Sequence, residues 1–144
     1  MRHQVKNVKF KSGQDANSML MRKLIYNFLR NSHLKTTEAK GKALKMYLDR
    51  LVSKSKEKTE ANKNYVLQYF QEKRVIDVLF NQVGPAVSQI EGGFVKLKRL
   101  NKRLNDATMM VEVQWAHPVV IEWEPQSKDT KVLAKGQSSS GLTK

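Results

Sequence analysis

The sequence predicts a protein that contains both helices and strands, with the helices first and the strands after them. Up to residue 84, apolar side chains recur at three- and four-residue steps, as on one face of a helix. After Gly92-Gly93, apolar and polar side chains alternate, as in strands with one buried face. The length of 144 residues and the 40% of hydrophobic residues are enough for one domain with a core.

Several helices are predicted in the first part of the chain. Residues 14–31 carry one apolar stripe: Leu20, Met21, Leu24, Ile25, Phe28 and Leu29. The next helix covers 37–55, because the side chain of Thr37 can cap a helix start and Glu38 is an acid suited to a first helical turn, and Thr59-Glu60 repeats this start signal. Gly41 inside it should weaken the helix by about 1 kcal/mol relative to alanine. Residues 59–84 form one long helix or two short ones, begun by Thr59-Glu60 and ended by Gly84-Pro85.

Three segments are candidates for strands after residue 93. Residues 94–100 alternate and carry lysines on one face, and 108–115 alternate again after the turn-forming pair Asn105-Asp106. These two segments predict a hairpin. A third alternation over 119–124 should pair along the hairpin or cover its edge. From about residue 125 the composition predicts a mobile tail.

Positive charge is spread through the chain, with 27 Lys and Arg against 13 Asp and Glu, a net charge of +14. Two segments, residues 1–12 and 94–103, contain several cations and no acid. Such an excess in a folded chain indicates a polyanionic partner, because phosphates relieve the repulsion between cations. Nucleic acid is therefore the first class of partner to consider.

Other classes of function have little support. The histidines His3, His33 and His117 lie in separate segments, and none has a partner at metal-ligand spacing. No catalytic motif is present, and the absence of cysteine excludes a disulfide scaffold and a thiolate zinc site. We therefore expect no catalytic residue, no metal and no cofactor. No apolar run is long enough for a membrane span and the N-terminus has no apolar signal region, so no membrane partner is expected.

An ordered set of short motifs carries a resemblance. In chain order they are Met1-Arg2-His3, Lys35-Thr36-Thr37 with Lys40 and Lys42, Ala61-Asn62-Lys63, Leu79-Phe80-Asn81 with Gly84-Pro85, Gly92-Gly93-Phe94 with Lys96, and Arg103 with Asp106. At these spacings the chain resembles the bacterial large-subunit ribosomal protein seventeen family. It departs from the family pattern at Gln4, Val5 and Asn7 in the arm, at Glu91 and at Asn105, and it extends past the usual C-terminal end.

The resemblance implies an α+β fold, with helices packed on one face of a small mixed sheet. The sheet would contain the hairpin and a short strand around His33–Lys35, and the helices would be 14–31, 37–55, 59–70 and 73–83, with a break near Gln71. The chain would then divide into three regions: a basic RNA-binding arm (1–13), a globular domain (14–115) and a C-terminal extension (116–144).

The function implied by the resemblance is structural. The chain would bind and organise large-subunit ribosomal RNA, take part in assembly of the cytoplasmic ribosome, and lie near other large-subunit proteins, including ribosomal protein thirty-two. The expected RNA-binding residues are Arg2, His3, Lys6, Lys9, Lys11, Arg22, Lys35, Thr36, Thr37, Lys40, Lys42, Lys63, Lys96, Lys98 and Arg103. The alternative is a free basic DNA- or RNA-binding protein, such as a nucleoid or regulatory factor. An enzyme acting on RNA is a weaker third interpretation.

Overall fold

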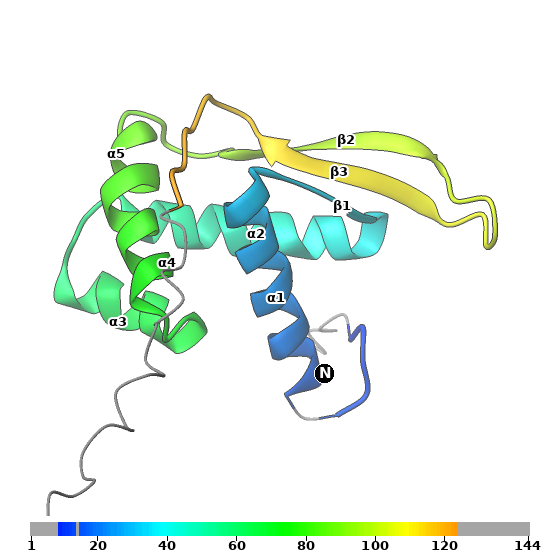
Figure 1. Ribbon diagram of the computed structural model, residues 1–144, viewed down its shortest axis with the longest axis horizontal. Helices are drawn as coiled ribbons and strands as arrows, with labels where there is room; N and C mark the ends of the chain where they lie inside the picture. The colour runs from blue at the N-terminus through cyan, green and yellow to red at the C-terminus, as the bar shows by residue number, and fades with distance from the viewer. Residues whose placement is uncertain (1–8, 14, 124–144) are drawn as a thin grey trace, which may run out of the picture.

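The computed structural model describes residues 9–13 and 15–123. The predicted combination of helices and strands is confirmed, and the helices lie on one face of the sheet (Figure 1). The predicted break between the third and fourth helices is also present. The elements in order are α1 (Ala16–Asn31), β1 (His33–Thr37), α2 (Glu38–Ser55), α3 (Glu60–Tyr69), α4 (Lys73–Val78), the π-helical turn η1 (Leu79–Val83), α5 (Gly84–Ala86), β2 (Val95–Lys102) and β3 (Met109–Trp115).

The sheet has three strands in the order β1-β3-β2, and both pairings are antiparallel. The expectation of a mixed sheet was therefore wrong in this detail. β2 and β3 form the predicted hairpin, while β1 comes from far earlier in the chain and pairs with the other side of β3. A strand of five residues carries no pattern that indicates its direction, so the orientation of β1 depends on how α1 and α2 pack.

Helix α2 crosses the sheet at Gly41, which is buried. A Cβ at this position would lie 2.5 Å from Cγ2 of Val111 in the central strand β3. The glycine therefore permits the close approach of helix and sheet, and its small cost in helix propensity is offset by this contact. Leu44, Leu48 and Leu51 continue the same face of α2 into the core.

The two predicted threonine caps behave differently. Thr59 precedes α3, and its hydroxyl accepts a hydrogen bond from the Asn62 amide at 3.3 Å, as a helix cap does. Thr37 occupies the equivalent position before α2, but its side chain makes no capping hydrogen bond. Thr37 is also the last residue of β1, and its pairing with Met110 helps to set its backbone. The prediction of a side-chain cap at Thr37 was therefore wrong.

The helical path continues past the predicted stop at Gly84-Pro85. η1 joins α4 directly to α5, and the Gly84 amide donates to the carbonyl of Leu79 across the wider turn. Pro85 lacks an amide hydrogen and is the second residue of α5, directly after this wider turn. Gly84 itself is buried, and a Cβ at this position would lie 2.3 Å from the carbonyl oxygen of Ser55. The glycine serves close packing here and does not end the helix.

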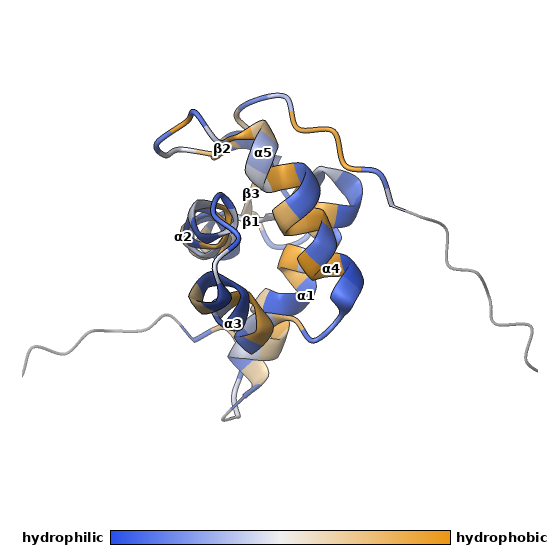
Figure 2. Cartoon of the chain, turned by 90° about the vertical axis from the view of Figure 1, so that its left-hand side faces the viewer, coloured by the Kyte–Doolittle hydropathy of each residue, from blue (hydrophilic) through white to orange (hydrophobic). Residues whose placement is uncertain are grey.

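Residues 117–123 form a strap across the helices, and no residue of this described segment pairs as a strand. The expectation that 119–124 pairs with or covers the hairpin was therefore wrong for the part that the structure describes. The strap runs beside the α4–α5 path (Figure 2). The side-chain amide of Gln82 donates to the Glu122 carbonyl at 3.1 Å and accepts from the Glu122 amide at 2.9 Å, and Trp123 Nε1 donates to the Leu29 carbonyl at 3.1 Å. The side-chain amide of Gln82 thus makes the backbone hydrogen bonds to this segment that a neighbouring strand would make.

The folded body therefore continues beyond β3. Val119 is buried in the main core, and Ile121 and Trp123 pack against that core. The ring of Trp123 lies 5.7 Å from that of Tyr26 in α1, measured between centroids. Apolar contacts and three hydrogen bonds thus hold the strap to α1 and η1. The predicted mobile tail from about residue 125 lies outside the described residues.

We predict that Gly41→Ala lowers the free energy of unfolding by about 1–3 kcal/mol, because the added methyl group overlaps Val111. Urea unfolding measures the change. Gly92→Ala is the matched control, since a Cβ at Gly92 meets nothing within 4 Å. Equal stabilities for the two variants would contradict the close approach of α2 and β3.

We also predict that Trp123→Ala lowers the free energy of unfolding by about 2–3 kcal/mol, through lost ring packing and the lost hydrogen bond to Leu29. Val120→Ala is the control, because Val120 is 78% exposed on the same segment, and it should change stability by less than about 0.5 kcal/mol. The idea that the strap is docked fails if both variants unfold at the same urea concentration as the parent chain.

Candidate nucleic-acid interface

One face of the sheet is left open by the described helices (Figure 1). Directly paired residues on neighbouring strands point to the same face, so the register decides which side chains meet there. Lys96 on β2 and His33 on β1 both pair with Gln114 of β3. Lys98 and Lys35 both pair with Glu112. The open face therefore carries two rows, each with an exposed basic or histidine side chain on both edge strands.

The open face carries more lysines than acidic residues. Glu112 lies between Lys35 and Lys98, and its carboxylate accepts a hydrogen bond from the side chain of Gln114 at 2.8 Å. Lys35, Lys96 and Lys98 make no ion pair with any of the described residues. The open face thus offers these three lysines to a polyanion, and this joins three of the residues predicted from the sequence.

A second basic group lies at the start of α2, on the helix side of the sheet, because Arg99 pairs with Val111, which faces α2. Glu38 binds Lys42 at 2.9 Å and Arg99 at 3.5 Å. The hydrogen bond and charge of Lys42, followed by the charge of Arg99, lower the pKa of the Glu38 carboxyl from its usual value. Two cations thus share one carboxylate, and a net positive charge remains beside β2.

The hairpin ends in a braced turn. The guanidinium of Arg103 donates from Nε to Asp106 Oδ1 at 2.9 Å and from Nη2 to Oδ2. The Thr108 amide donates to the same carboxylate at 3.2 Å, and the Arg103 amide donates to the Thr108 carbonyl at 3.0 Å. Arg103 was predicted to contact RNA, and in the described structure two of its five guanidinium N–H groups bind Asp106. Its role in the described structure is to hold the turn.

The other predicted residues lie in different places. Thr36 is buried, and its methyl group faces the Gly41 contact, so its side chain serves packing. Arg22 donates to the Gln68 carbonyl at 2.9 Å and ties α1 to the end of α3. Lys63 is exposed on α3 and pairs with Glu60 at 3.7 Å, away from the sheet. Thr37 is the last residue of β1, and Lys40 and Lys42 lie near the start of α2.

Part of the predicted arm can be placed. Lys9 and Lys11 are exposed, and the Phe10 amide between them donates to Asn17 Oδ1 at 3.2 Å, so this part of the arm lies against the start of α1. Arg2, His3 and Lys6 lie outside the described residues. The candidate set omitted His33, which lies on the open face, and two exposed cations of β2, Arg99 and Lys102. Strand alternation with Lys35 could have identified His33, and the acid-free run 94–103 already contained the other two.

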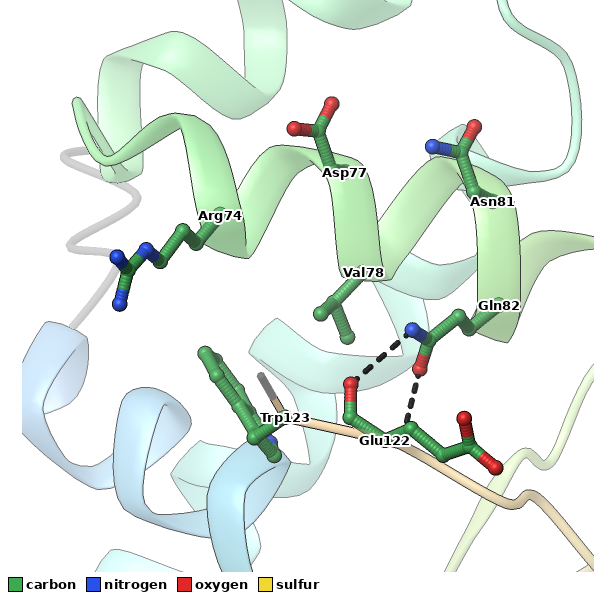
Figure 3. Close-up of a pocket in the computed structure, with 7 residues that line it drawn as sticks. All are labelled: Arg74, Asp77, Val78, Asn81, Gln82, Glu122 and Trp123. Atoms are coloured by element: carbon green, nitrogen blue, oxygen red, sulfur yellow. Dashed lines mark hydrogen bonds between the residues drawn. The ribbon is translucent and has the colours of Figure 1, made fainter. Parts of the chain in front are cut away.

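Two surface hollows lie beside the strap and the helices. One, of about 240 Å³, is bordered by Arg74, Trp123 and the Gln82–Glu122 pair (Figure 3). The other, of about 490 Å³, lies between α1 and the α3–α4 connection and is lined in part by Tyr26, Tyr69 and Phe70.

Within residues 9–13 and 15–123, no group of His, Asp or Glu side chains is arranged to hold a metal ion. None of the described helices combines the length and apolar character required to cross a bilayer.

Two further ionisable groups have shifted pKa values with structural causes. Burial, followed by the hydrogen bond with Tyr65, raises the pKa of Tyr69 to about 12. Burial also raises the pKa of Asp49, against the opposing effects of Lys45 and the amides of Phe94 and Val95. Both groups lie on the helical side of the sheet and pack against other elements, so we assign them to the fold.

We predict that the Arg103–Asp106 brace persists in acid. Hydrogen bonds from Arg103 and Thr108 hold the pKa of Asp106 well below its usual range. A lowered pKa stabilises the turn above the unfolded value of about 3.9, and this contribution is lost only as the pH falls through the lower folded value. The NMR shift of the Thr108 amide should therefore stay constant from pH 7 to about pH 3. Asp106→Asn should displace it already at pH 7. A titration of this amide centred near pH 4 would contradict the brace.

Comparison with known proteins identifies the family of this chain. A family described as ribosomal protein L17 matches residues 20–116, from within α1 to the end of β3. The large ribosomal subunit protein bL17 of Carboxydothermus hydrogenoformans is 31% identical over 70% of this chain and 90% of its own length. That of Thermodesulfovibrio yellowstonii is 27% identical over 91% of this chain and 98% of its own. That of Salinibacter ruber is 28% identical over 100% of this chain and 68% of its own. Because the family match covers more than half of the residues, the chain belongs to the ribosomal protein L17 family and is a structural, non-enzymatic component of the large ribosomal subunit.

Proposed function

We propose that this chain binds large-subunit ribosomal RNA through the open face of its sheet. The observation that carries the proposal is the strand register, which sets Lys35 on the same face as Lys96 and Lys98 although 60 residues of chain lie between Lys35 and Lys96. Strands in a sheet are about 4.8 Å apart, so the two edge strands hold their cations about 10 Å apart. Along β2, alternate residues are about 7 Å apart. The cations thus form a grid that suits a phosphate backbone.

The mechanism is neutralisation of phosphates by an already ordered surface. Lys35, Lys96 and Lys98 stand on paired strands, so binding requires the ordering of their side chains but not of their backbone. Each neutralised phosphate releases counterions, which makes the affinity fall steeply with salt. A-form RNA presents its backbone and its shallow minor groove, so recognition of shape and phosphate is expected.

The N-terminal arm extends this surface in the proposal. Arg2, His3, Lys6, Lys9 and Lys11 would add contacts without a competing acid, since residues 1–12 contain none. Residues 1–13 then act as an RNA-binding arm, 14–115 as the globular domain and 116–144 as an extension. Deletion of residues 2–11 should leave the helical circular dichroism unchanged and lower the occupancy of the chain in large subunits.

Ribosomal protein thirty-two is the neighbouring protein that we propose, on the strength of the resemblance to the family. Crosslinking of intact large subunits followed by mass spectrometry tests it. Crosslinks from this chain to other proteins, with none to protein thirty-two at matched lysine density, would remove this partner and leave RNA binding untouched.

We predict that changing Lys35, Lys96 and Lys98 together to Gln lowers the affinity for large-subunit ribosomal RNA fragments. The slope of log affinity against log salt should fall by about 2–3, close to one for each lost phosphate contact. The control changes Lys23, Lys54 and Lys73, which are exposed on α1, α2 and α4, to Gln and removes the same total charge.

The control variant should change the slope by less than about 1. Equal effects of the two triple variants would show that net charge alone drives binding and would remove the sheet face as the site.

Sedimentation addresses the alternative of a free nucleic-acid-binding protein. Quantitative migration with large subunits supports the ribosomal function, and a large free pool bound to DNA contradicts it.

A further inference from the structure

The β2–β3 hairpin projects well beyond the rest of the body (Figure 1). Strand β1 ends opposite Met110, so the turn after Lys102 has no neighbouring strand on either side among the described residues. A register shift between Arg99 and Lys102 inserts a bulge just before the turn. Bulges increase the twist of a hairpin and change the direction of the chain beyond them. The tip is thus a separate feature with its own direction.

Leu104 at this tip is 100% exposed, more than any of the other large hydrophobic side chains among the described residues. Single exposed apolar residues are common and mean little by themselves. Here the exposure is combined with a fixed backbone, because Arg103 before Leu104 and Asp106 after it form the bidentate brace. The Ala107 amide also donates to the Arg103 carbonyl at 2.9 Å. These hydrogen bonds therefore hold the backbone of Leu104 in place at the end of the hairpin.

The charges at the tip cancel within the turn. Arg103 and Asp106 neutralise each other, which leaves Leu104 and Asn105 as the outward groups, with Lys102 and Lys98 behind them on β2. The tip is consequently unsuited to a phosphate, whereas the strand behind it is suited to one. The apolar surfaces of RNA are its ribose edges and the faces of unstacked bases, and they lie beside phosphates.

We propose that Leu104 is an apolar contact with large-subunit ribosomal RNA, packed against a ribose or an unstacked base, while Lys102 binds an adjacent phosphate. Arg103 and Asp106 are positioning residues that hold Leu104 outward. The inference rests on the proposed RNA-binding function and adds a site at which affinity does not depend on charge. It also accounts for a leucine at the most exposed point of a basic hairpin.

The dependence of binding on salt distinguishes this contact from the cationic ones. Leu104→Ser should weaken binding of the full chain to overlapping fragments of large-subunit ribosomal RNA by about tenfold, the order that burial of one leucine side chain gives. The slope against salt should stay unchanged, because no phosphate contact is lost. Leu104→Met is the matched control and should bind within about twofold of the parent chain. Lys102→Gln should instead lower the slope by about 1.

The absence of cysteine from the sequence allows a second test inside the assembled particle. Leu104→Cys creates a single attachment point for a short photo-crosslinker, and Met46→Cys, at a position 68% exposed on α2, is the control. We expect the crosslinker attached at position 104 to join ribosomal RNA in large subunits. Crosslinks from that position to protein alone would overturn the proposal in favour of a protein contact, and an absence of crosslinks would overturn it as well.

The outcomes separate this proposal from the one it rests on. If the parent chain binds no ribosomal RNA fragment, the RNA-binding function fails, and the tip contact with it. If the parent chain binds with a steep salt dependence but Leu104→Ser binds equally well, only the tip contact fails. Thermal unfolding of each variant should match the parent chain, since the side chain of Leu104 packs against nothing in the described fold.

Discussion

Strand β3 pairs with β1 on one side and with β2 on the other, and it presents Val111, Val113 and Trp115 to the helices. The remaining structure depends on this central position. The contact with α2 at Gly41 is made through Val111, and the ring of Trp115 lies 4.8 Å from that of Phe28 in α1, measured between centroids. On its other face the same strand aligns the cations of both edge strands. One strand therefore connects the core to the candidate RNA surface.

The sheet divides apolar and charged side chains between its two faces, and the sequence can do this only because side chains alternate along a strand. A shift of β1 by one residue would turn Leu34 and Thr36 outward and Lys35 into the helices. The register is thus secured by burial of Thr36 and by the packing of Leu34 against the core. The arrangement of cations needs no interaction among the cations themselves, since it results from the hydrophobic packing beneath them.

Acidic residues near the basic surface hold structure in place. Glu38 binds two cations at the start of α2, Asp106 braces the hairpin turn, and Glu112 lies between the lysines of the edge strands. Each carboxylate reduces repulsion among neighbouring cations in a chain of net charge +14. Arg103 shows that a cation in a basic segment can also have a structural role, because part of its guanidinium holds the hairpin turn through Asp106.

Periodicity and composition by themselves determined the first two helices, the helical character of 59–84, the hairpin, the break between helix-rich and strand-rich parts, and the basic character of β2. These are local properties, since the spacing of apolar residues within one element decides which face it buries. The pairing of β1 with β3, the close approaches at Gly41 and Gly84 and the docking of the strap through Gln82 were decided by the tertiary structure. Each of them depends on which side chains or backbones from other positions in the chain come within contact distance, and such contacts leave no periodic pattern in the sequence.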